Sequence, residues 1–200
     1  MTRIGRGLAA ILAFAVLAML AGCAGTNFRR PEPQELALGK STAADVQRVM
    51  GPPRETVDSL RNEEPLKVMR YTYAQGAGQG RYPGVVPARS MVFTLHHGLL
   101  VAQEFVSSFQ SDATEFDQSQ AGAIVKGRTT RTEVINLLGR PNGEAIYPVI
   151  RSRNDRALVY SYSHARGTAF SMKFYSKVLV VSFDGDGVVT DLQFSSTGDE

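Results

Sequence analysis

The sequence predicts an α+β protein of two tandem modules, each a short helix-turn-helix packed on an antiparallel sheet of three to four strands. Two observations lead to this prediction: a helical segment occurs twice, and alternating apolar runs typical of strands follow each copy. A third concerns cysteine. The chain of 200 residues has one cysteine, so no internal disulfide can form and the fold must depend on its core.

The first 22 residues are typical of a signal peptide. Arg3 and Arg6 supply a positive start, and residues 8–20 form an unbroken apolar run. This run is too short for a helix that spans a bilayer, which needs about 20 residues, but it suits a signal-peptide core. The sequence Leu-Ala-Gly then precedes Cys23, the single cysteine.

This ending resembles the lipobox of bacterial lipoproteins. The resemblance implies cleavage between Gly22 and Cys23, diacylglycerol on the Cys23 sulfur and acylation of its new amine. Several acyl chains would hold the protein firmly in a membrane. Residue 24 is Ala24 rather than the aspartate of inner-membrane lipoproteins, which implies the periplasmic face of the outer membrane. The alternative is an ordinary secretory signal followed by an unmodified cysteine.

Residues 23–34 are expected to form a lipidated tether. Arg29 and Arg30 could contact anionic headgroups, although a solvated tether is the simpler interpretation. Without Arg3 and Arg6 of the signal, the 22 basic residues fall to 20 against 19 acidic ones. This balance indicates no nucleic-acid partner.

The repeated helix carries its own start and stop residues. Residues 39–53, GKSTAADVQRVMGPP, align without a gap with residues 127–141, GRTTRTEVINLLGRP. Thr42 and Thr130 each stand three residues before an acidic residue, as in a capping box, and each copy ends in Gly-x-Pro. The apolar residues between them form one helical stripe that we expect to be buried: Val46, Val49, Met50, Val134, Leu137 and Leu138.

Gly39-Lys40-Ser41 also has the ending of a phosphate-binding loop. Such a loop needs a glycine where this chain has Gln34, and it should follow a buried strand. The second copy replaces the lysine with Arg128. We therefore interpret the motif as a helix entrance and expect no nucleotide binding.

Two hairpins are predicted at equivalent places. Residues 92–105 align with residues 181–194, and in each segment two apolar runs flank a glycine-bearing turn. Tyrosine-rich strands at residues 71–73 and 160–162 precede them. The repeats predict a first module at residues 35–110 and a second at 111–200, opening on short helices at residues 35–38 and 114–126.

This pattern resembles the SmpA/OmlA (BamE-like) family of outer-membrane lipoproteins. The family signature has a Gly-Thr helix entrance, a helix ending in Gly-x-Pro, a tyrosine strand and an apolar hairpin. Residues 127–194 match it nearly throughout, whereas His96-His97 replaces the expected aspartate turn in the first copy. Tandem units of this shape also occur in the secreted β-lactamase inhibitor protein.

Catalytic and metal-binding patterns are weak. In a strand, the adjacent His96 and His97 should point to opposite faces and so could not easily share a metal ion. Residues 184–187, DGDG, fit a hairpin turn better than a calcium loop. We therefore expect no enzyme, no metal and no cofactor.

Two segments are candidates for a partner-binding surface. Residues 75–88, QGAGQGRYPGVVPA, predict a long loop that contains Tyr82. Residues 165–176 occupy the equivalent place in the second module and contain the remaining candidates: Phe170, Met172, Phe174 and Tyr175. Exposed apolar groups there would suggest binding. Alternatively, residues 170–174 extend the following strand and pack in the core.

The predicted function is a non-catalytic outer-membrane lipoprotein that binds an envelope protein and supports outer-membrane assembly or integrity. If the modules lie side by side, the two candidate segments could form one continuous surface. The alternative is a periplasmic inhibitor or ligand-binding module resembling the tandem β-lactamase inhibitor protein.

Overall fold

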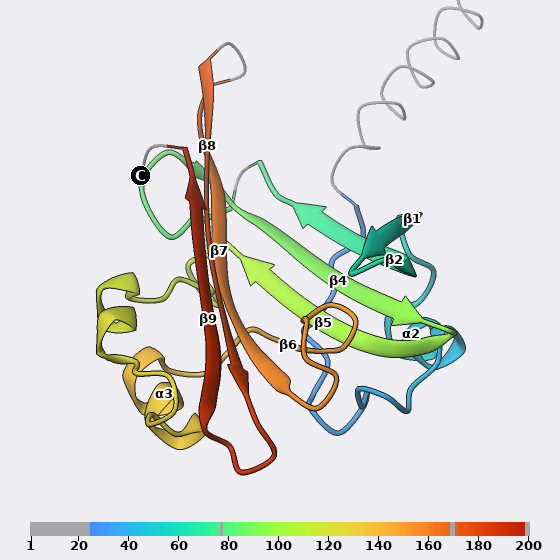
Figure 1. Ribbon diagram of the computed structural model, residues 1–200. Coiled ribbons are helices and arrows are strands. Elements are labelled where there is room, and N and C mark those ends of the chain that lie inside the picture. Colours follow the sequence, from blue (N-terminus) through green and yellow to red (C-terminus); the bar gives the residue numbers. More distant parts are fainter. Residues whose placement is uncertain (1–24, 77, 169–170, 199–200) are drawn as a thin grey trace, which may run out of the picture.

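One antiparallel sheet dominates the computed structural model, which describes residues 25–76, 78–168 and 171–198 (Figure 1). Its strand order is β1-β2-β4-β5-β6-β7-β8-β9, and β3 pairs with β7. The strands are β1 (Glu55–Arg61), β2 (Glu64–Ala74), β3 (Val85–Val86), β4 (Ala88–His96), β5 (Leu99–Ser107), β6 (Gly143–Ile146), β7 (Arg156–Thr168), β8 (Ser171–Phe183) and β9 (Val189–Thr197). The helices are α2 (Ala43–Met50), the 3-10 helix η2 (Gln118–Ala123) and α3 (Arg131–Leu138). The predicted α+β class is confirmed.

The description as two separate helix-turn-helix modules is not confirmed. The sheet is continuous, because β5 pairs with β6 from Ala102↔Ala145 to Glu104↔Gly143. Residues 35–38 form turns, and the expected helix at residues 114–126 contains the 3-10 helix η2. Segments this short lack the backbone bonds that sustain an α-helix. The division between residues 110 and 111 stays a prediction.

The start and stop residues of the repeated helix are confirmed. Thr42 and Thr130 are the N-caps of α2 and α3, and each forms a full capping box with the acidic residue three positions later. Gly51 and Gly139 end the helices with φ of 78° and 80°, a conformation that favours glycine. In the described part of the chain, no helix has the length and apolar character needed to cross a membrane.

The same backbone contacts attach both helix entrances to the sheet. The Gly39 amide donates to the Leu100 carbonyl at 2.7 Å, and the Gly127 amide donates to the Val189 carbonyl at 2.7 Å. The interpretation of Gly39-Lys40-Ser41 as a helix entrance is confirmed, because Thr42, the next residue, is the N-cap of α2. The Gly39 amide is occupied by its hydrogen bond to β5.

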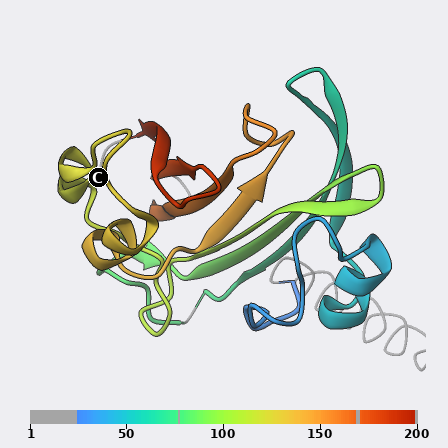
Figure 2. The ribbon, with the colours of Figure 1, turned by 60° about the horizontal axis from the view of Figure 1, so that its bottom comes forward.

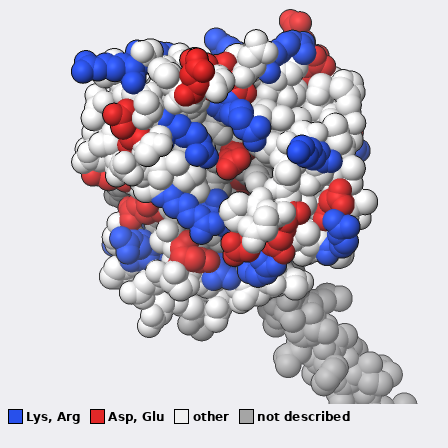
Figure 3. Space-filling model, turned by 90° about the horizontal axis from the view of Figure 1, so that it is seen from below, with Lys and Arg blue, Asp and Glu red and all other residues white. Residues whose placement is uncertain are grey.

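Both helices cover the same face of the sheet (Figure 2). The register Ala102↔Ala145↔Ala157 places these alanines on the opposite face, where Ile150 packs against them. Because side chains alternate along a strand, their neighbours in the sequence face the helices. Figure 3 shows basic and acidic side chains interspersed on the lower side of the molecule.

The apolar stripes of the helices are buried less completely than expected. Val46, Val134 and Leu138 are buried in the two cores beneath the helices. Val49, Met50 and Leu137 are only partly buried at the edges of those cores. The helices of eight residues lie at the surface, so the outer side of each stripe remains accessible to water.

Residues 25–34 do not form a free tether. The Phe28 ring makes edge contacts with the rings of Tyr71 and Phe105, both at 6.5 Å between centroids. Arg30 donates to the Pro141 carbonyl at 2.9 Å, so it is partly buried instead of solvated. Gly25 lies so close to β2 that a Cβ atom there would come within 2.1 Å of the Thr72 carbonyl oxygen. The expectation of a solvated tether is therefore wrong for these residues.

Candidate functional site

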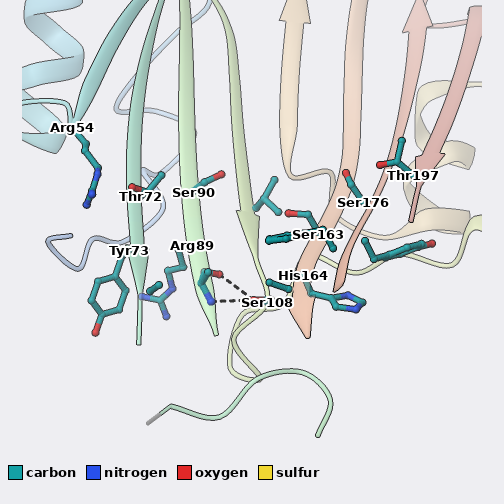
Figure 4. A pocket seen from close by; sticks show the side chains of 16 residues that line it. Arg54, Thr72, Tyr73, Arg89, Ser90, Ser108, Ser163, His164, Ser176 and Thr197 are labelled. Carbon is teal, nitrogen blue, oxygen red and sulfur yellow. Dashed lines mark hydrogen bonds between the residues drawn. The ribbon is translucent and has the colours of Figure 1, made fainter. Parts of the chain in front are cut away.

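A cleft of about 510 Å³ opens where β5 and β7 separate (Figure 4). The short strand β6 lies between them and pairs with β5 only as far as Glu104↔Gly143. Pro141 precedes it, and a proline cannot donate to a strand ladder. Small side chains line much of the cleft, among them Thr72, Ser90, Val106, Ser163, Ser176 and Thr197.

Asn142 holds the two halves of the sheet together just before they separate. Its backbone accepts from the Phe105 amide at 2.8 Å and donates to the Val159 carbonyl at 3.0 Å. Its buried side-chain amide donates to the Phe105 and Ser161 carbonyls at 2.6 and 3.0 Å, and its oxygen accepts from the Ser161 amide at 2.7 Å. The Asn142 side chain therefore hydrogen-bonds the backbone of β5 and of β7 where β6 no longer lies between them.

Glu104 lies at the same junction. Ser161 donates from its hydroxyl to a Glu104 carboxylate oxygen at 2.5 Å. Burial raises the pKa of the Glu104 carboxyl, and the hydrogen bond from Ser161 partly opposes that shift. The junction of the two sheet halves is thus a buried polar site at which a charge on Glu104 is costly to maintain.

Arg89 lines the cleft, and its guanidinium group is fixed by several partners on the face of the sheet that carries Tyr71 and Met91. Arg89 forms an ion pair with Asp112 at 2.9 Å and donates to the Asn27 side chain at 2.8 Å. Its guanidinium lies 4.6 Å from the centroid of the Phe109 ring, and Tyr73 stacks on that ring at 5.9 Å. These contacts hold the Arg89 side chain against Asp112 and Phe109, so it stiffens the strand ends beside the cleft.

One wall of the cleft is the hairpin of β7 and β8. The His164 ring lies 5.4 Å from the Tyr175 ring, and both residues line the cleft. Tyr175 is buried, whereas its neighbour Phe174 is 70% exposed. An exposed phenylalanine beside a cleft lined with small side chains is a candidate anchor for a partner.

The other predicted binding residues lie apart from the cleft lining. Met172, near the tip of the hairpin, is 38% exposed, and Tyr82 is 42% exposed. The Tyr82 hydroxyl donates to the Glu115 carboxylate at 2.6 Å, so this ring is fixed at the surface. Gly22, Cys23 and Phe170 lie outside the described residues.

The two candidate segments do lie side by side. Strand β3, within residues 75–88, pairs with β7 through Val85↔Arg166 and Val86↔Ala165. Most of residues 165–176 belong to a hairpin, because β7 continues to Thr168 and β8 begins at Ser171. The alternative that residues 170–174 extend the following strand is confirmed from Ser171 onward, but their core packing is wrong for Met172 and Phe174, which are exposed.

Sequence reasoning missed Asn142, Arg89 and Glu104. The repeat contained one indication: Asn142 aligns with Arg54, so the two copies differ where the sheet halves meet. No local pattern marks Arg89 or Glu104, because their partners are distant in the sequence.

The expectation that His96 and His97 point to opposite faces is wrong. Their ring centroids are 3.9 Å apart. His97 does not continue strand β4, because it lies in the turn before β5 with a φ of 49°. This backbone conformation returns its ring to the side of His96.

Comparison with known families and structures gave matches of different strength. Residues 113–193 match the family described as the outer membrane protein assembly factor BamE domain, over about two fifths of the chain. A protein of Streptococcus mutans proposed to be a β-lactamase inhibitor has a TM-score of 0.41 and 13% sequence identity. That alignment covers 81% of this chain and 91% of the other, and a likeness this distant carries no argument. The search of curated proteins gave no match.

The family match covers η2, α3, β6, β7 and β8, and it reaches into β9. It includes the capping box of α3 and the tyrosine strand on which the resemblance was based. Residues 113–193 of this chain are therefore similar to the outer membrane protein assembly factor BamE domain.

Proposed function

We propose that this protein is a non-catalytic lipoprotein of the outer membrane that binds another envelope protein during outer-membrane assembly. The observation that carries the proposal is the BamE domain at residues 113–193, since that family is named for outer-membrane protein assembly. An assembly factor acts by binding, so the relevant site is a surface that can receive part of a partner.

The cleft between β5 and β7 is the surface that suits this role best. Its lining combines small polar side chains with the exposed Phe174 ring. Interface energy is usually concentrated in a few aromatic and arginine side chains near the centre of a contact. A segment of a partner could therefore insert between the sheet halves and pack against Phe174.

The N-terminal segment supports a location at a membrane surface. Phe28 packs against the sheet, and Cys23 precedes it by five residues. Such a segment spans at most about 18 Å when fully extended. If Cys23 carries lipid, the first half of the sheet is held close to the membrane.

The test compares two exposed phenylalanines on opposite faces of the sheet. Phe174 lines the cleft, whereas Phe194 is 47% exposed and pairs with Leu179, which faces the helices. Chemical crosslinking in native membranes, followed by pull-down, should recover a partner with the wild type and with Phe194→Ala. Phe174→Ala should recover much less of it, with a nearly unchanged thermal melt.

An equal yield from Phe174→Ala and Phe194→Ala would show that the cleft does not bind the partner. A strongly lowered melting temperature in Phe174→Ala would assign this ring to folding instead. The alternative of a periplasmic inhibitor stays a prediction, and an unlipidated, secreted product would favour it.

A further inference from the structure

Three potential metal ligands lie at the end of the sheet opposite the cleft. Glu64 begins β2, and His96 and His97 stand at the turn between β4 and β5. One ligand atom from each of the three side chains lies within 4.8 Å of the other two. Glu64 and His96 are partly buried, and His97 is exposed, so the group is accessible from solvent.

Two tight turns bring these side chains together. Asn62 and Glu63 connect β1 to β2 with φ of 50° and 65°, and His97 and Gly98 connect β4 to β5 with φ of 49° and 82°. Two consecutive residues with positive φ are typical of the two-residue turns that fit hairpin twist. Because each turn is this short, each ligand lies on or beside a rigid strand end.

The two oxygens of the Glu64 carboxylate have separate partners. Oε2 lies 3.1 Å from Nε2 of His96, on the side of the imidazoles. Oε1 accepts from the Tyr147 hydroxyl at 2.9 Å and lies 3.5 Å from an Arg153 nitrogen. Arg153 also donates to the Tyr147 hydroxyl at 2.7 Å. Outer partners of this kind orient ligating carboxylates in metal sites.

We propose that Glu64, His96 and His97 bind one divalent transition-metal ion of the Zn²⁺ type. Two imidazoles and one carboxylate are ligands suited to Zn²⁺, whereas Ca²⁺ and Mg²⁺ prefer oxygen ligands alone. Two ligands of a tetrahedral Zn²⁺ lie about 3.3 Å apart, close to the 3.1 Å between Glu64 and His96. The fourth position is left for water or for a group from a partner.

Bound metal would connect parts of the chain that are distant in sequence. It would join the β1–β2 turn to the β4–β5 turn, while Tyr147 and Arg153 connect Glu64 to the segment after β6. All three ligands lie outside residues 113–193, so the BamE match does not assign this site. The proposal is independent of the cleft and of the partner proposed above.

The test is Zn²⁺ binding to the full chain in detergent, without a histidine tag, measured by competition with a chromogenic chelator. The wild type should bind one Zn²⁺ per chain. His97→Asn should weaken binding at least about tenfold, since it removes a ligand while asparagine tolerates the positive φ. The matched control is Asp186→Asn, because Asp186 aligns with His97 in the second hairpin and should leave the affinity unchanged.

Two further measurements separate metal ligation from other effects. Glu64→Gln should also weaken Zn²⁺ binding, and Zn²⁺ should raise the melting temperature of the wild type but not of His97→Asn. X-ray absorption at the zinc edge should show two imidazole ligands. Equal Zn²⁺ affinity in the wild type and His97→Asn, or wild-type affinity weaker than about 1 mM, would overturn the proposal and leave an ordinary Glu64–His96 hydrogen bond.

Discussion

At the residue scale, Asn142 is the side chain on which the union of the sheet halves most depends. Asn142→Ala would leave the Ser161 amide and the Phe105 carbonyl without their side-chain partner. Buried groups that lose a partner cost about 1–3 kcal/mol each, so we expect a loss on the order of 3 kcal/mol. Urea unfolding of the wild type and Asn142→Ala measures this loss in the free energy of unfolding. Arg54→Ala, at the aligned position, is the control and should cost less than about 1 kcal/mol. Equal losses would contradict the bridging role.

Glu104 predicts a dependence of stability on pH. Because burial raises the pKa of its carboxyl in the folded state, the unfolded chain loses this proton first as the pH rises. The free energy of unfolding should therefore fall from the ordinary glutamate pKa up to the raised pKa, and then level off. Glu104→Gln retains an oxygen for Ser161 and should remove this decline. Its stability relative to the wild type should increase between pH 4 and pH 7; a constant difference would show that Glu104 does not titrate abnormally.

At the element scale, the two adjacent leucines of α3 should behave differently. Leu138 is buried in the core beneath the helix, whereas Leu137 is partly buried at its edge. Leu138→Ala should cost about 2–5 kcal/mol, the usual range for a buried leucine, and Leu137→Ala clearly less. Denaturant unfolding of both variants decides this, and similar losses would mean that the helix packs differently.

The same scale shows what the sequence could predict. The capping boxes, the glycine stops and both hairpin turns follow local rules, because the residues that make each contact are neighbours in the sequence. Burial of the full helical stripe could not be read in this way, because it depends on how far the sheet extends beneath each helix. The proximity of His96 and His97 was missed for a related reason: a single positive φ at His97 reverses the direction that strand alternation predicts.

At the scale of the whole molecule, the repeat predicted two equivalent units but could not predict that they share one sheet. Besides the two-residue pairing of β3 with β7, that union rests on the three-residue pairing of β5 with β6 and on the side chain of Asn142. These are long-range contacts without a sequence pattern of their own. The cleft could not be predicted either, because it opens where the pairing of β5 with β6 ends. The sequence predicts that residues 75–88 and 165–176 are neighbours only if the two modules lie side by side. The pairing of β3 with β7 makes them neighbours.

The N-terminal anchor gives the last prediction. If Cys23 is lipidated, the wild type should stay in the membrane fraction and incorporate labelled fatty acid, and Cys23→Ser should do neither.

Because Cys23 is the single cysteine, its lipidation leaves any introduced thiol as the sole site for a fluorophore. Arg54→Cys lies beside the docked N-terminal segment, where Arg54 and Gly25 line one pocket, and Asp186→Cys lies in the β8–β9 turn. Since Phe28 holds the first half of the sheet within about 18 Å of the anchor, a quencher attached to lipid headgroups should quench the label at position 54 more strongly. Equal quenching at the two positions would show that the body of the protein is not held in this orientation at the membrane.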